Sequence, residues 1–370
     1  MLLQQAPPNP SPWRGTGKTQ VMLKPLKNFT KSLISPLLDA TGLYGRRIEG
    51  ASRPAGSWTI MMYHRVIEDT ARDPFQLGMC VMRDRFERQI RYLSSRFNIL
   101  TVQDAMSRMA RGEPLPPRAL SITFDDGYLD TLTRALPVMQ RYGAPFSVYV
   151  PTGGIAEGQW LWWDRVIAAM AGSRRSEIDL QEVGLTSESE HLPLQSINAA
   201  SHVERVLNLL WALDGASCEY CVERIVRWLD PRPMPWLQAE RLSVGQVQEL
   251  HRQGVEVGAH SVNHPNLALA GAEAQGIEMR QGAATLESWV QQPIAGFAYP
   301  GGHCNESARE QARSAGFAYA LSTLAGVNHA DSLKPWELLR IGMPDAELPD
   351  FRRSVGGAML RNMHGAHLRF

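Results

Sequence analysis

Apolar positions along the chain follow two different spacings, and the two spacings alternate. Runs such as ALSITF at 119–124 suit a buried strand, whereas apolar residues spaced three and four apart, as at 84–97, suit a helix. Strand-like and helix-like segments alternate in the first half of the chain, at residues 57–66, 84–97, 119–124, 129–143 and 146–152. Strands and helices in this order predict a parallel α/β sheet or barrel.

The alternation stops at residues 160–236 and then resumes. The interrupting part starts with WLWWDRV and continues as polar loops and helices without clear strands. Ser243 and Gly254 have the residue types that begin and end a helix. After the interruption, helices are predicted at 242–254, 272–290 and 306–316, and strands at 255–260, 294–300 and 317–323. We therefore predict one barrel-like α/β domain over residues 57–345 that carries a helical insertion at about 160–236.

The two ends of the chain differ from this domain. Residues 1–21 are rich in proline and are expected to be disordered. Residues 22–50 carry apolar residues at helical spacing among lysines and arginines. A basic amphipathic helix of this kind either contacts an anionic membrane surface, here through residues 22–48, or packs on the domain. Residues 346–370 are expected to form a C-terminal tail.

Composition and charge exclude several classes of protein. The 370 residues are 44% hydrophobic and 20% charged with a net charge of +1, which is ordinary for a globular protein and gives no reason to expect nucleic acid as a partner. Four cysteines are too few for a disulfide scaffold, and Cys218 and Cys221 form a lone CxxC on a predicted helix, where packing explains them. The first residues lack the order of a secretory signal, so we expect a cytoplasmic protein, peripheral to the inner membrane if residues 22–48 bind it.

Two polar motifs follow predicted strands and carry the candidate chemistry. Asp125 and Asp126 stand side by side after one strand, and neighbouring carboxylates repel each other unless a positive charge lies close by. His260 and His264 follow another strand, in HSVNHP. Two imidazoles and a carboxylate suit Zn²⁺ or a similar divalent ion, with Co, Ni, Mn or Fe as other candidates. We predict that Asp126, His260 and His264 bind the metal and that Asp125 acts as a general base beside it.

These motifs resemble those of a known family. TFDDG at 123–127 and HSVNHP at 260–265 are similar to the first two motifs of the NodB-homology polysaccharide deacetylases, and the resemblance covers roughly residues 57–345. It implies a distorted (β/α) barrel and removal of N- or O-acetyl groups from sugars with a divalent metal. It also implies the same roles for the four residues: Asp125 as base, and Asp126, His260 and His264 as ligands.

The remaining motifs match the family less completely. FAYPGG at 297–302 resembles the third motif, which implies that Tyr299, Pro300 and Gly301 line the sugar groove. The late Leu-x-His motif that supplies the family's general acid is not found, and Arg340 stands in the corresponding run WELLRIG. YHRV at 63–66 is more like the exopolysaccharide deacetylases of the poly-N-acetylglucosamine type, so His64 is the candidate acid. A structural histidine at a strand end is the alternative.

Two further residues are candidates for substrate binding, and the function follows from the whole set. Trp163 of WLWWDRV could stack on a sugar ring or anchor the insertion, and Arg340 stands in the expected position of the family's late motif. We predict a metal-dependent hydrolase that removes N-acetyl groups from a polysaccharide or oligosaccharide. The alternatives are a metal amidohydrolase acting on a non-sugar C–N bond and a glycan-binding barrel without turnover.

Overall fold

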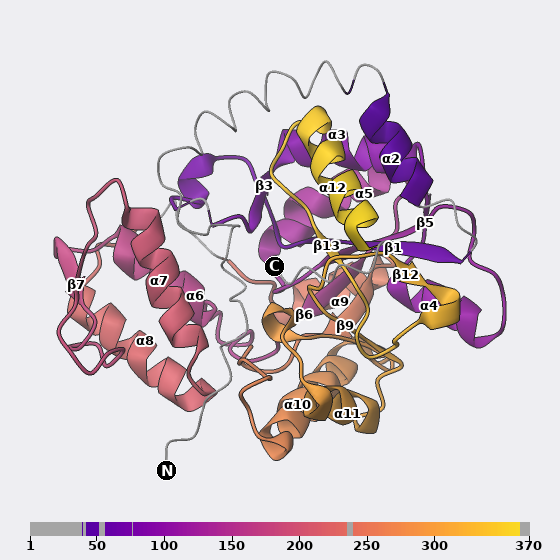
Figure 1. Cartoon of the computed structure of the whole chain (residues 1–370). Coiled ribbons are helices and arrows are strands. Elements are labelled where there is room, and N and C mark those ends of the chain that lie inside the picture. Colours follow the sequence, from indigo (N-terminus) through magenta and orange to yellow (C-terminus); the bar gives the residue numbers. More distant parts are fainter. Residues whose placement is uncertain (1–38, 40–41, 52–55, 76, 235–239, 363–370) are drawn as a thin grey trace, which may run out of the picture.

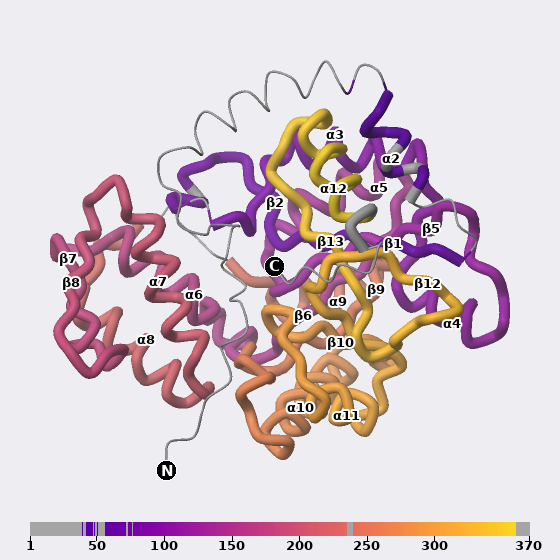
Figure 2. The backbone as a smooth tube through the Cα atoms, in the orientation of Figure 1, coloured from indigo at the N-terminus to yellow at the C-terminus, as the bar shows by residue number. Residues whose placement is uncertain are grey.

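A curled, mostly parallel sheet forms the centre of the molecule. The computed structural model describes residues 39, 42–51, 56–75, 77–234 and 240–362. In this part of the chain the main sheet has nine strands, in the order β11-β10-β9-β6-β5-β1-β12, with β4 beside β5 and β13 beside β1 (Figure 2). The strands are β1 (Ser57–Tyr63), β4 (Asn98–Ile99), β5 (Ala119–Phe124), β6 (Ser147–Val150), β9 (Glu256–Ala259), β10 (Gly296–Ala298), β11 (Tyr319–Leu321), β12 (Asn328–His329) and β13 (Ile341–Gly342). The α/β fold predicted from the sequence is confirmed.

The segment that contains β13 closes the curled sheet into a distorted barrel. Leu338 pairs with Leu321 of β11, and Ile341 pairs in parallel with Met61 of β1. One short segment therefore bridges the two edge strands of the parallel run. Arg340 lies within this bridge, so its side chain is placed at the closure of the barrel.

Helices cover the outside of the sheet and connect its parallel strands. In Figure 1, α3 and α5 lie on one side of the barrel, and α10 and α11 lie on the opposite side. Each turns an apolar face inward, as Phe86, Ile90 and Leu93 of α3 do. These helices are α3 (Arg83–Ser94), α4 (Val102–Ala110), α5 (Leu136–Arg141), α9 (Val244–Arg252), α10 (Ala272–Val290) and α11 (Glu306–Ser314).

Within the predicted insertion, the described residues 160–234 form a separate lobe beside the barrel. It contains α6 (Trp162–Ala171), α7 (Ala199–Trp211) and α8 (Gly215–Leu229), which lie together to the left of the barrel in Figure 1. The lobe also has a short antiparallel pair, β7 (Glu177–Asp179) with β8 (His191–Pro193). The sequence pattern did not predict this pair, because it indicated only loops and helices in the insertion. Cys218 and Cys221 are buried free thiols in the core of this lobe. The packing interpretation of the CxxC is therefore confirmed.

The prediction of a C-terminal tail is wrong, because residues 348–362 form a packed helix. In α12 (Leu348–Asn362), Phe351, Val355 and Met359 are buried in the main core. The helix packs on α2 (Leu43–Ala51) and on α3. The barrel domain thus extends beyond residue 345. The expected disorder of residues 1–21, and most of the expected amphipathic helix at 22–50, lie outside the described residues.

Some predicted elements agree closely with the structure, and others shift. The strand at 119–124 and the helix at 272–290 have the predicted bounds, and Ser243 caps α9 through a capping box with Gln246. The predicted helix at 129–143 instead begins with a π-helical turn, Thr131–Ala135, before α5. The predicted strand at 57–66 is two strands, β1 and β2 (Arg65–Ile67), and β2 pairs with β3 (Cys80–Met82). None of the described helices has the length and hydropathy needed to cross a membrane.

Candidate metal centre

The barrel brings the predicted site residues together because parallel strands end at the same edge. Asp125 follows β5, and its amide donates to the carbonyl of Tyr63 at the end of β1, at 3.1 Å. His260 follows β9, and its amide donates to the carbonyl of Val150 at the end of β6, at 3.2 Å. Side chains after neighbouring parallel strands therefore converge over the mouth of the barrel.

The loops that carry the candidate ligands have unusual backbone conformations. Asp126 has a φ of 74° and His264 a φ of 55°, both in the left-handed region that non-glycine residues rarely adopt. The Ser261 hydroxyl accepts the amide of His264 at 3.0 Å and so supports this turn. Strained residues held in this way concentrate at functional sites, where the surrounding structure fixes them.

Three buried side chains form a compact donor set. The Nε2 atoms of His260 and His264 lie 3.4 and 3.5 Å from Oδ1 of Asp126. One ligand atom from each residue lies within 4.8 Å of the others, and no other such group of three occurs among the residues that the structure describes. The three residues proposed as ligands from the sequence are thus brought together.

The chemistry of this set fits a divalent cation. Nδ1 of His260 lies 2.7 Å from the carbonyl of Ala298, which can only accept, so Nδ1 carries a proton and Nε2 is the nitrogen left to face Asp126 and a metal ion. Burial, followed by the nearby His260, lowers the pKa of His264 to about 3, so the ring of His264 is neutral at pH 7. Two imidazole nitrogens and a carboxylate oxygen that converge in a buried space form the mixed nitrogen and oxygen donor set that suits zinc.

Asp125 does not join this set, because it is bound to Arg340. The guanidinium donates from Nη1 to Oδ1 at 2.8 Å and from Nη2 to Oδ2 at 2.7 Å, and both residues are buried. Burial alone would raise the pKa of Asp125, but the charge and hydrogen bonds of Arg340, together with the nearby His260 and His64, outweigh burial, and the pKa lies below its ordinary value. Asp125 is therefore held ionised beside Asp126, with each oxygen keeping one lone pair for another donor.

A cavity of about 460 Å³ opens on the donor set. His64, Asp125 and Asp126 line it together with both histidine ligands. His64 lies half-buried between β1 and β2, and its ring is the one candidate proton donor that the sequence placed at this mouth. The rest of the wall is largely apolar and includes Met62, Leu77, Met79, Val81, Ile341, Met343 and Pro344.

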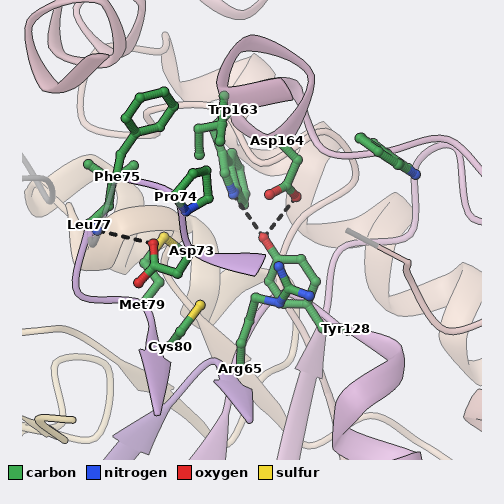
Figure 3. Close-up of a pocket in the computed structure, with 12 residues that line it drawn as sticks. Arg65, Asp73, Pro74, Phe75, Leu77, Met79, Cys80, Tyr128, Trp163 and Asp164 are labelled. Carbon is green, nitrogen blue, oxygen red and sulfur yellow. Dashed lines mark hydrogen bonds between the residues drawn. The ribbon is translucent and has the colours of Figure 1, made fainter. Parts of the chain in front are cut away.

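Trp163 of the insertion connects the lobe to the metal centre. Its ring packs on His264, with ring centroids 4.4 Å apart at an interplanar angle of 61°. Its Nε1 donates to the Tyr128 hydroxyl at 2.9 Å, and that hydroxyl donates to Asp164 at 2.8 Å (Figure 3). The Arg65 guanidinium lies over the Tyr128 ring, 4.6 Å from its centroid. These contacts fix the face of the insertion against one candidate ligand.

The predicted substrate-binding residues divide into two groups. Gly301 and Trp163 line the cavity, as expected of groove residues. Tyr299 is fully buried, with its hydroxyl donating to the carbonyl of Trp336, and Pro300 is buried in the following turn. Arg340 has no exposed surface, and its predicted contact with substrate is replaced by the contact with Asp125. A buried side chain whose donors are already engaged cannot reach a bound sugar.

The structure adds site residues that the sequence did not indicate. Trp211, at the end of α7, lines the cavity with its ring centroid 5.8 Å from that of His264. Tyr128 stands directly after the TFDDG motif, and this position next to the motif could have identified it as a site residue. Trp211 gave no signal, because it lies 53 positions before His264 in a segment without a motif.

Three comparisons with known proteins bear on the family of this chain. A family model described as polysaccharide deacetylase matches residues 112–178 and 203–320, together half of the chain. A poly-β-1,6-N-acetyl-D-glucosamine N-deacetylase from Escherichia coli is 31% identical over 101 residues, which are 27% of this chain and 14% of that protein. The chain therefore matches only a small part of this curated relative.

Solved structures show the same fold at low identity. The Streptococcus pyogenes deacetylase PplD superposes with a TM-score of 0.55 at 18% identity, covering 81% of this chain and 98% of that one. IcaB from Ammonifex degensii gives a TM-score of 0.51 at 20% identity, covering 83% and 97%. With half of its residues matched by the family model and a distorted barrel in common with these structures, the chain belongs to the polysaccharide deacetylase family of enzymes.

Proposed function

We propose that this protein is a metal-dependent hydrolase that removes N-acetyl groups from an N-acetylated glycan of the exopolysaccharide type. The observation that carries the proposal is the buried set of Asp126, His260 and His264 with the ionised Asp125 beside it, at the floor of one cavity. The N-acetylglucosamine polymer named for the Escherichia coli relative supports an amide rather than an ester as the bond cleaved.

Each residue has a definite task in this proposal. Asp126, His260 and His264 would hold a divalent ion, with zinc as the first candidate from the mixed nitrogen and oxygen donors. When bound, such an ion lowers the pKa of a coordinated water and polarises a carbonyl group. Asp125 accepts the proton of the attacking water, because Arg340 keeps its carboxylate ionised and oriented.

The leaving amine of the sugar needs a proton, and His64 is the proposed donor. It lines the same cavity as the four acidic and histidine residues and is only half-buried, so an amine in the cavity can reach its ring. Trp163 and Gly301 line this cavity too, where an aromatic face and an open backbone suit a sugar ring.

Acetate release from N-acetylglucosamine oligomers tests this function directly. The protein loaded with Zn²⁺ is expected to release acetate and to stop when the metal is removed by a chelator. An oligomer that binds without acetate release would show a glycan-binding barrel without turnover. If the oligomers neither bind nor release acetate, the result would favour a substrate with a non-sugar amide bond.

The location of the protein is a separate proposal. A cytoplasmic protein that contacts an anionic membrane surface through residues 22–48 is consistent with the basic and apolar pattern of that segment. Fractionation of cells that express the full chain, or a chain without residues 22–38, tests this contact.

A further inference from the structure

The metal cavity extends from the donor set to a wall formed by β1, β13 and α12. Met62 of β1 pairs with Gly342 of β13, and both residues line the cavity. Ser354 and Ala358 line it from α12, which follows β13 in the chain and lies against it. The cavity of about 460 Å³ therefore reaches from the metal centre to the segment that closes the barrel and to the helix after it.

Charged groups in this cavity are confined to the metal centre. Among the described residues that line the cavity, the carboxylate and imidazole side chains are those of Asp125, Asp126, His64, His260 and His264. No lysine, arginine or amide side chain lines it in this part of the chain, and the remaining side chains are aliphatic or aromatic except for Thr323 and Ser354. Sugar hydroxyls need hydrogen-bond partners and gain little from such a wall, whereas a hydrocarbon group gains by leaving water.

Gly342 leaves room for a group at this wall. A glycine in a strand often marks a place where a ligand comes close to the backbone. A Cβ atom added at Gly342 would have, apart from its chain neighbours, one described atom within 4 Å, which is Cε of Met62 at 3.5 Å. Gly342 is exposed, although Ile341 and Met343 beside it are buried. The end of β13 thus presents bare backbone to the metal cavity, next to the flexible side chain of Met62.

The apolar lining is larger than an acetyl group needs. A methyl group and a water molecule each take up ~30 Å³, whereas the cavity has a volume of about 460 Å³. Three of the lining residues are methionines, whose unbranched side chains adapt to the shape of a bound chain: Met62, Met79 and Met343. The sugar carries hydroxyls and stays joined to the rest of its glycan, so an acyl chain of several carbons is the part of a substrate that matches this lining.

We propose that this cavity holds the hydrocarbon tail of an N-acyl group longer than acetyl, and that the enzyme cleaves such amides of amino sugars in preference to acetyl amides. The inference rests on the proposed function and adds the acyl group that the cavity selects. With the amide at the metal centre, the tail lies along Met62 and Gly342 towards Ala358. Water supplies the oxygen that the acyl carbon gains and the hydrogen that the nitrogen gains when the C–N bond breaks. The products are a carboxylic acid of the same chain length and the free sugar amine.

Substrates that differ only in acyl length test the inference. Trimers of β-1,6-linked glucosamine that carry either acetyl or butyryl groups are incubated with the zinc-loaded full chain, and the sugar amine released is measured with an amine-reactive fluorophore. We expect kcat/KM for the butyryl trimer to exceed that for the acetyl trimer by about tenfold or more, because each buried CH₂ group adds about fourfold. A butyryl-to-acetyl ratio near or below one would overturn the inference and leave the proposed deacetylase in place.

Glycine variants locate the effect at β13. Gly342→Val fills the space beside Met62 and should bring the butyryl-to-acetyl ratio close to one. Gly342→Ala adds one methyl group in ordinary contact with Met62, and its ratio should lie between those of Gly342→Val and the parent. The control is Gly245→Val, at an exposed glycine of α9 that also has open space around it but does not line the cavity, and it should keep the parent ratio. If both Gly342 variants keep the parent ratio while urea unfolding shows folded proteins, the inference is wrong.

Binding of free carboxylic acids separates failure of this inference from failure of the proposed function. Acetate and hexanoate share a carboxylate and differ only in the hydrocarbon tail, so calorimetry on the zinc-loaded protein compares the tails. We expect hexanoate to bind at least about tenfold more tightly than acetate, and Gly342→Val to remove the difference. If neither trimer is turned over but this binding pattern is found, the proposed function fails and the acyl cavity stands. Equal affinities of the two acids, or no binding of either, would overturn the cavity assignment.

Discussion

Arg340 and Asp125 form a buried pair in which Nη1 donates to Oδ1 and Nη2 donates to Oδ2, although 215 positions separate the two residues in the chain. Nε of Arg340 donates to the carbonyl of Ser322 at 2.8 Å, which fixes the orientation of the guanidinium. Because neither residue is exposed, each charge depends on the other for compensation. The pair therefore connects the segment that closes the barrel, through Arg340, to the proposed base Asp125.

Replacing Arg340 tests this pair. Arg340→Met leaves Asp125 buried without its partner, so we expect a loss of about 3–5 kcal/mol in the free energy of unfolding by urea. The pKa of Asp125 should rise, because the charge and hydrogen bonds of Arg340 no longer oppose the effect of burial, and acetate release at neutral pH should fall by at least about tenfold. Arg340→Lys keeps the positive charge but loses the two parallel hydrogen bonds. Its free energy of unfolding and its rate of acetate release should lie between those of the parent and of Arg340→Met.

As a control, Arg313→Met in the exposed pair with Glu310 should change the unfolding free energy by about 0.5 kcal/mol or less. An Arg340→Met protein as stable as the parent would contradict the account.

Substitution of Asp125 and substitution of a metal ligand should have different effects on metal content and on kcat. Asp125→Asn is expected to keep the bound metal and to lose about two or more orders of magnitude in kcat. His264→Ala should lose the metal itself, measured as metal content after dialysis. His202→Ala, at a partly buried histidine of α7 that does not line the cavity, serves as the matched control and should change neither the metal content nor kcat. Normal turnover by Asp125→Asn would remove the base assignment.

Removing one hydroxyl should weaken the link between the insertion and the metal centre. Tyr128→Phe leaves Nε1 of Trp163 without the acceptor at 2.9 Å, which we expect to cost about 1–3 kcal/mol of stability. Since Trp163 packs on His264, zinc affinity should also fall by about tenfold, as judged by competition with a fluorescent chelator. Tyr220→Phe, on the exposed face of α8, is the control. Unchanged zinc affinity in Tyr128→Phe would show that the contact does not support the ligand.

Asp164 should make the stability depend on pH. Burial raises its pKa to about 7, against about 3.9 for an unfolded aspartate, so the folded state binds the proton more tightly. The resulting stability is complete below pH ~4 and is lost as pH rises through ~7. The urea midpoint of the parent should therefore fall, relative to that of Asp164→Asn, between pH 5 and pH 8. Asp230→Asn, at an exposed aspartate, should follow the parent at both pH values. If the urea midpoints of the parent and of Asp164→Asn differ by the same amount at pH 5 and at pH 8, the raised pKa of Asp164 is refuted.

Local sequence patterns predicted most of the barrel. The strand at 119–124 and the helix at 272–290 were predicted with their observed bounds. The strand is buried at every position and therefore reads as a short apolar run, whereas burial of one face gives the helix its repeat of apolar residues. In contrast, α12 was missed, since its Gly356-Gly357 pair and mean hydropathy do not suggest a buried helix. Its burial depends on α2 and α3, which are distant in the chain.

The sequence by itself determined which residues stand at the strand ends: Asp125, Asp126, His260 and His264 follow β5 and β9, and parallel strands bring such ends together. Only the tertiary structure decided which side chains surround them. Arg340 meets Asp125 because the segment with β13 closes the barrel, and the insertion meets His264 through Trp163 and Trp211. Such contacts join segments with no shared period or motif, so they follow from how the packed elements fit together and not from local residue preferences.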